Sequence, residues 1–169
     1  NNRILIVGIA LADTSDSVIN VTYGGTALTR ITSTLSGNSV EMWSLLAPPA
    51  GTTNIVATWT ANRDMVGWSG TFTNVDQTNP IRNSAVASGN STTPSITVAS
   101  AAGYLVVDTL SANGDAVSLT VGAGQTQICQ NTTGTGGGDC WGASSYEPGA
   151  DSVTMSWLAG VAKNWGIAA

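Results

Sequence analysis

Short β-type runs separated by turn residues extend along the whole chain, and this alternation constrains the fold more than any other feature. Apolar or alternating runs recur from Arg3–Leu11 to Asn164–Ala168, with Gly, Pro, Asn and Asp between them. No window places apolar residues at i, i+3, i+4 and i+7 without an interrupting glycine or proline, as an amphipathic helix requires. We therefore expect one all-β domain over residues 1–169, a two-sheet antiparallel β-sandwich of jelly-roll-like order.

Two segments near the N-terminus carry specific local predictions. The segment Arg3–Leu11 is β-branched and almost continuously apolar, which is typical of a strand covered on both faces. The runs Val18–Tyr23 and Thr26–Ser33 flank Gly24-Gly25. Because glycine accepts a positive φ without strain, this pair predicts a tight hairpin turn.

Two later predictions concern how neighbouring runs connect. The runs Ile55–Thr60 and Met65–Thr73 are separated by four residues, and this spacing predicts a second hairpin. Further along, Ile81–Ser88 is expected to be a strand that is followed by a polar loop over Gly89–Pro94.

The composition restricts the kinds of partner. Charged residues make up 9% of the chain and hydrophobic residues 42%, the net charge is −5, and histidine is absent. The polar surface must come from Thr, Ser, Asn and Gly, and no basic patch can form, so we expect no nucleic-acid partner. No apolar run approaches the ~20 residues that span a bilayer, so we expect no membrane insertion. This composition fits an extracellular or cell-surface protein.

The two cysteines flank a glycine-rich stretch. Two thiols without any histidine cannot form a structural zinc site, and the separation of Cys129 and Cys140 differs from the C-x-x-C of redox sites. We expect a disulfide that closes a loop between adjacent strands, which would indicate an oxidising compartment. The alternative is a pair of free buried thiols.

The residues for common catalytic machinery are missing. Without histidine, a Ser-His-Asp triad and a Cys-His pair are excluded. A glycosidase needs two carboxylates facing each other across the substrate, and the only glutamates are Glu41 and Glu147. We therefore expect no catalytic residues and no enzymatic activity.

Calcium is the one cofactor that the sequence favours, through two polar loops. Asp13 and Asp16 lie in one loop, and Asn74 and Asp76 lie in another. Oxygen ligands of this kind suit Ca²⁺. The alternative is ordinary turn chemistry, in which Asp and Asn side chains accept from their own backbone.

The sequence suggests two roles for glycans, as groups attached to the protein and as bound ligands. Three N-x-S/T sequons place candidate glycosylation sites at Asn20, Asn90 and Asn131, the last two in expected loops and Asn20 in an expected strand. The six tryptophans should be mainly core residues, above all Trp59 and Trp157, which lie in phase with apolar neighbours. Trp141 and Tyr146, near the glycine-rich stretch, are the candidates for an exposed sugar-binding platform.

Several stretches together resemble a β-sandwich domain that is repeated in large secreted and surface proteins of bacteria and archaea. The resemblance covers most of the chain and is carried by Val21–Thr29, by Glu41–Leu45 with the Ala47–Gly51 turn, by the Val75–Thr78 loop and by Ala102–Asp108. It implies an adhesive or structural module, with no catalytic residue to carry over. It also implies a further strand before Asn2 and a last strand longer than Asn164–Ala169.

These features together favour a non-catalytic structural or adhesive module of an extracellular fibre, pilus or surface protein. Its expected partners are copies of itself or other domains of the same protein. Because the chain opens almost directly into the apolar Ile4–Val7 run, we expect an open sheet edge beside it, which a neighbouring subunit could fill by strand donation. The alternatives are a trimmed strand and a fold that never had it. A second hypothesis is a carbohydrate-binding module that uses an exposed aromatic face.

Overall fold

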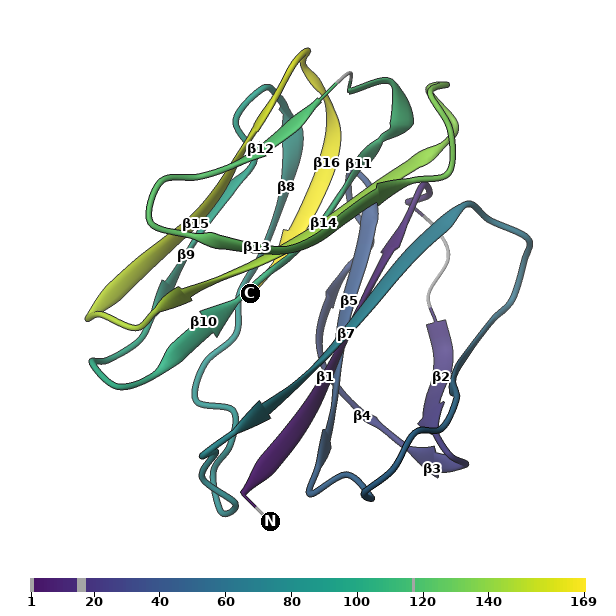
Figure 1. The fold of residues 1–169 in the computed structure, drawn as a ribbon. Coiled ribbons are helices and arrows are strands. Elements are labelled where there is room, and N and C mark those ends of the chain that lie inside the picture. The colour runs from purple at the N-terminus through teal and green to yellow at the C-terminus, as the bar shows by residue number, and fades with distance from the viewer. Residues whose placement is uncertain (1, 15–17, 117) are drawn as a thin grey trace.

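The structure is a computed structural model that describes residues 2–14, 18–116 and 118–169, and it is built from antiparallel strands (Figure 1). The strands in this part of the chain are β1 (Arg3–Leu11), β2 (Val18–Tyr23), β3 (Thr26–Ala27), β4 (Thr29–Thr34), β5 (Ser39–Leu46), β6 (Ile55–Trp59), β7 (Met65–Thr73), β8 (Val86–Ser91), β9 (Ser95–Ala99), β10 (Leu105–Val107), β11 (Thr109–Asn113), β12 (Leu119–Val121), β13 (Thr126–Thr132), β14 (Cys140–Pro148), β15 (Ser152–Ala159) and β16 (Lys163–Ala168). The predicted all-β antiparallel sandwich is confirmed.

The described strands form four hydrogen-bonded sheets stacked as layers, where two sheets were expected (Figure 1). The first outer sheet has the order β3-β2-β6, and it packs on the first inner sheet, β4-β5-β1-β7. The second inner sheet has the order β10-β14-β11-β16-β8, with β13 on the other edge of β14. The second outer sheet, β12-β15-β9, covers its far side.

Strand β1 lies at the centre of this stack, which explains its continuous apolar sequence. Leu5, Val7 and Ile9 pack toward the first outer sheet. Ile4 and Ile6 belong to the cluster between the two inner sheets. Because alternate residues point to opposite faces and both faces are covered, every position of the strand favours an apolar residue. The prediction of a strand covered on both faces is confirmed.

Strand β1 is also paired along both of its edges. Ile4–Leu11 pairs with β5, and Arg3–Leu11 pairs with β7. The expectation of an open sheet edge beside Ile4–Val7 is therefore wrong, and strand donation at that edge has no place in this fold. The apolar run reflects burial between layers rather than a missing neighbour.

The two inner sheets approach each other closely through glycine. A Cβ atom on Gly8 of β1 would overlap the Thr109 hydroxyl of β11, and one on Gly166 of β16 would overlap the backbone oxygen of Asn38. Gly142 of β14 is similarly tight against the Val66 side chain. Small residues on three strands thus set the separation of the inner sheets.

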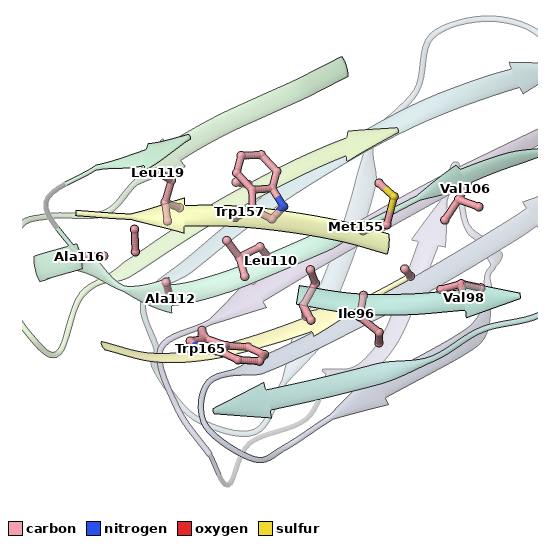
Figure 2. Packing of buried hydrophobic residues seen from close by; sticks show 14 of the residues in the cluster. Ile96, Val98, Val106, Leu110, Ala112, Ala116, Leu119, Met155, Trp157 and Trp165 are labelled. Carbon is pink, nitrogen blue, oxygen red and sulfur yellow. The ribbon is translucent and has the colours of Figure 1, made fainter. Parts of the chain in front are cut away.

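The largest core cluster lies between the second inner and second outer sheets (Figure 2). Trp157 and Met155 of β15 and Leu110 of β11 are almost fully buried there. The expectation that Trp157 is a core residue is confirmed. Trp59, which was also expected in the core, is only half-buried, on the short strand β6.

The tight hairpin turn predicted from Gly24-Gly25 is confirmed. Tyr23 pairs with Thr26 across Gly24 and Gly25, whose φ angles are 55° and 83°. Two positive φ values are what a type I′ hairpin turn requires.

The second predicted hairpin is wrong, because its two strands belong to different sheets. Strand β6 pairs with β2, and β7 pairs with β1. The predicted strand Ile81–Ser88 is displaced as well, because β8 extends through Gly89 and Asn90 to Ser91 to pair with β16.

The predicted disulfide is also wrong: Cys129 and Cys140 are both free. Cys129 is opposite Ser144 on β14, whereas the carbonyl of Cys140 accepts from the N–H of Thr133. Four residues of strand separate Ser144 from Cys140, which is roughly 13 Å. A disulfide requires Cα atoms within about 7 Å. The alternative of two free thiols is the one that this geometry supports.

Helical structure in the described residues is limited to a 3₁₀ turn at Gly114–Ala116, and no helix there could span a membrane.

Candidate functional site

A cavity of about 580 Å³ lies between the two inner sheets, next to residues 74–83. Its walls come from the N-terminal part of β1, the end of β7, strand β10 and the end of β9. The side chains that face it are predominantly apolar and include Ile4, Ile6, Phe72, Val98 and Val106. A cavity of this size with an apolar interior and polar groups at the mouth is typical of a ligand site.

Asp76 organises the polar rim of this cavity. Its carboxylate accepts from the backbone N–H groups of Thr78 at 2.8 Å and Asn79 at 3.2 Å, and it forms an ion pair with Arg82 at 2.6 Å. These backbone N–H groups, with help from the Arg82 guanidinium, lower the pKa of Asp76 below its ordinary value. The loop is therefore fixed by its own side chain, and the rim carries a balanced pair of charges.

Tyr104 also lines the cavity, next to Arg82. The Arg82 guanidinium lies over its ring, 5.6 Å from the centroid. Tyr104 remains 43% exposed and the adjacent Leu105 44% exposed. A partly exposed aromatic ring and a partly exposed apolar side chain thus line the cavity beside the Asp76–Arg82 pair.

The two candidate calcium loops lie in different parts of the fold. Asp76 already has three partners, as described above, and its neighbour Asn74 adopts a positive φ of 60° in the same loop. Asp13, at the other end of β1, forms an ion pair with Arg63. Asp16 lies outside the described residues. Within the described ranges no group of three or more Asp, Glu, Cys or His residues is placed to hold a metal ion. The contacts seen here are those of turn chemistry, and calcium binding stays a prediction.

The three sequon asparagines are all exposed. Asn20 lies on β2 opposite Thr58, next to an irregularity in the ladder. Asn90 and Asn131 lie on β8 and β13 rather than in the loops expected for them, and the Asn90 amide donates to Asn164 at 2.8 Å. Glycosylation at these positions stays a prediction.

The structure does not bring Trp141 and Tyr146 together as a platform. Both are half-buried residues of β14, five positions apart. Because side chains alternate along a strand, they project from opposite faces of the sheet. Trp141 packs against the core cluster of Figure 2. The exposed aromatic residue at the cavity mouth is Tyr104 instead.

Asp108 is a fully buried carboxylate that the sequence reasoning did not single out. It accepts from the Trp157 indole N–H at 2.7 Å, and from the Ser145 N–H at 2.6 Å and hydroxyl at 2.8 Å. Burial raises the pKa of Asp108 to about 6, although these donors favour the ionised form. Asp108 separates β10 from β11 in phase with the core residues Val106 and Leu110, and this phase was readable in the sequence.

Glu41 is the second fully buried carboxylate, on β5. It accepts from the Val18 N–H at 2.8 Å and the Trp43 indole N–H at 3.0 Å, and Arg30 lies 3.8 Å away. Burial raises the pKa of Glu41 above its ordinary value, against the effect of these partners. Both buried carboxylates thus hold strands and indoles in place.

Comparison with known proteins gives no match: no family model, no curated protein and no solved structure is similar to this chain. Any function must therefore be argued from the fold and its cavity alone.

Proposed function

We propose that this protein is a non-catalytic structural or adhesive module of an extracellular fibre or surface protein. The observation that supports this most is the construction of the stack. Both inner sheets are buried on both faces, and glycines at Gly8, Gly142 and Gly166 hold them in close contact. Such an arrangement favours a rigid module that connects other parts of an assembly and presents its surfaces for contact.

The use of the acidic groups supports the same proposal. Asp108, Glu41 and Asp76 each bind donors from their own chain. A hydrolase would need a pair of carboxylates that face a shared open space. The exposed strand faces carry Thr, Ser and Asn, which suit contact with other polymers in a salt-rich medium because they do not depend on charge.

The test combines assembly with an activity screen. The purified chain is followed by sedimentation and negative-stain electron microscopy at rising concentration, and is incubated with polysaccharide, peptide and ester substrates. We expect concentration-dependent assembly and no turnover. Polysaccharide hydrolysis that disappears in Glu147→Gln or Asp108→Asn would overturn the proposal.

Glycan recognition is the second candidate function, and one observation favours it. Tyr104 presents a partly exposed ring beside Arg82, Asp76 and Asn79, and planar polar groups next to an aromatic ring are suited to sugar hydroxyls and to the apolar face of a sugar. A glycan array would show binding that Tyr104→Ala removes and Trp141→Ala retains. Binding that depends on Trp141 alone would place the sugar site elsewhere.

A further inference from the structure

Two buried side-chain oxygens near the 3₁₀ turn accept no hydrogen bond from the described residues. They are Oδ1 of Asn113, the last residue of β11, and Oδ1 of Asp115, within the turn. The other carboxylate oxygen of Asp115 accepts from the Lys163 ammonium, so only one side of this group is satisfied. A buried acceptor without a donor costs free energy. Two such oxygens, two residues apart, have a common explanation if they share one positively charged partner.

The facing glycine-rich loop fixes how both side chains lie. Asn113 Nδ2 donates to the carbonyl of Gly137. Turning this amide over would set its oxygen against that carbonyl oxygen, so Oδ1 must lie on the other side. Asp115 lies against the same residue, because a Cβ atom built on Gly137 would be 3.5 Å from its Oδ2 atom. Both unpartnered oxygens therefore belong to side chains that pack on Gly137.

The same loop brings main-chain oxygens to the residue between these two side chains. A Cβ atom on Gly114 would lie 2.8 Å from the carbonyl oxygen of Gly134 and 3.0 Å from that of Gly136. The two carbonyls thus converge beside Gly114, in a space that any larger residue would fill. Oxygen atoms that approach one another without an intervening donor are typical of a cation site.

Asp139 adds a second carboxylate, and strand pairing holds it in place. Asn113 is opposite Cys140 in the β11–β14 ladder, and the Gly114 N–H donates to the Asp139 carbonyl at 2.8 Å. The Asp139 carboxylate accepts from the Gly136 N–H at 2.6 Å through Oδ2. Side chains that are carried by paired strands keep their positions better than side chains on a free loop.

We infer that these groups form a binding site for a divalent cation, and Ca²⁺ is the ion that the donors fit. The donors are the side-chain oxygens of Asn113, Asp115 and Asp139 and the carbonyl oxygens of Gly134 and Gly136. Calcium prefers such a mixture of carboxylate, amide and main-chain oxygens, and its coordination is flexible. The site differs from both calcium loops that the sequence favours, and it stands or falls independently of the proposed function.

The charges around the site set the strength of binding. Asp115 and Asp139 contribute two negative charges, and Lys163, bound to Asp115, contributes one positive charge. The site is therefore net negative, but only weakly so. Sites with few carboxylates in extracellular modules bind calcium at roughly 0.1–1 mM, and we expect a Kd in that range.

A calcium titration followed by NMR tests the site residue by residue. The ¹⁵N-labelled full chain is freed of metal with a chelator and titrated with CaCl₂ to several millimolar. The amide signals of Gly114, Gly134 and Gly136 should shift and saturate, while those of Thr78 and Asn79, in the Asp76 loop, should not. Sodium chloride at the same ionic strength is the control and should leave the three glycine signals in place.

Three variants separate calcium binding from a general effect of charge. Asp115→Asn keeps the shape of the side chain and removes its charge, and it should weaken binding by roughly tenfold or more. Lys163→Met removes the cation that competes for Asp115, and it should tighten binding several-fold. Asp151→Asn is the matched control, an exposed aspartate in the β14–β15 turn, and it should leave the Kd unchanged. The calcium-free spectrum of each variant shows whether it is folded.

The inference would be overturned by any of four results. The first is no saturating shift of the three glycine signals in the wild type, and the second is a shift that sodium chloride reproduces. The third is a saturating shift confined to Thr78 and Asn79, which would place calcium at the Asp76 loop. The fourth is an unchanged Kd in folded Asp115→Asn and Lys163→Met. None of these bears on assembly or turnover, so the proposed function is tested separately.

Discussion

Single buried side chains determine much of the balance of stability in this protein, and Asp108 is the clearest case. Its carboxylate has no exposed surface and lies among an indole, a serine and a strand backbone. Its neighbours provide donors for a charge, yet burial still favours the neutral acid. The protein therefore holds an ionisable group whose charge costs free energy at neutral pH.

The first prediction concerns the pH dependence that follows from Asp108. Its folded pKa, about 6, lies above the ordinary value of 3.8. The stabilising contribution is therefore fully present below pH 4 and is lost as pH rises through 6, an effect of about 3 kcal/mol at most. Asp108→Asn cannot ionise, and its amide offers one acceptor oxygen to the Ser145 and Trp157 donors where the carboxylate offers two. The stability advantage of the wild type over this variant should shrink between pH 4 and pH 7, as measured by urea unfolding.

A constant difference between wild type and Asp108→Asn across this pH range would contradict that assignment. Asp76 provides an internal check of the sign, because its pKa is lowered. Its contribution is present above the ordinary pKa of an aspartate and is lost as pH falls, opposite to that of Asp108.

The second prediction concerns the close contact of the inner sheets at Gly166. A side chain there would meet the backbone oxygen of Asn38, which cannot move without shifting the strand. Gly166→Ala should therefore destabilise the protein by about 1–3 kcal/mol. Gly67→Ala on β7 is the matched control, because an added Cβ there meets only one carbonyl oxygen, at 4.0 Å. Equal unfolding midpoints for the two variants would show that the sheets can separate freely.

At the scale of elements, the β13–β14 hairpin decides the chemistry of the cysteines. Its register puts Cys129 and Cys140 at different positions along the β13–β14 ladder and in different hydrophobic clusters. Burial raises the pKa of the Cys140 thiol to about 11 and also raises that of Cys129. Both groups are therefore protonated, weak nucleophiles at neutral pH.

The third prediction follows from this hairpin. Without reductant, the folded chain should react slowly with iodoacetamide, and Cys129 should react before the more deeply buried Cys140. The unfolded chain should take up two equivalents, as counted by intact mass spectrometry. An unfolded, unreduced chain that takes up none would show that the two sulfurs are bonded.

The elements also show what the sequence could and could not predict. Strand positions such as β7 follow from local alternation and turn residues, so they were predictable. Which strands pair with each other was not predictable. Strands β6 and β7 follow one another in the sequence, but they belong to different sheets. Asp108 was readable, since it is in phase with Val106 and Leu110.

At the scale of the whole molecule, the four layers should act as one cooperative unit. Each inner sheet contributes to two clusters, so no layer can separate without exposing apolar surface on its neighbour. Trp43 lies in one half of the stack and Trp157 in the other, which gives optical probes of both.

The fourth prediction is that tryptophan fluorescence and far-ultraviolet circular dichroism give one coincident transition in urea. The reason is that the inner sheets share their interface, so loss of one half exposes the other. Two separated transitions would show that the sandwiches on either side of that interface unfold independently.

The central place of β1 has a mechanical consequence. Its ladders with β5 and β7 run along nearly its whole length, and its side chains are held by layers above and below. A load that enters through the N-terminal end and draws along this strand would shear two hydrogen-bond ladders at once, instead of opening one bond after another. A force applied along β1 would therefore meet its strongest resistance at β1 itself.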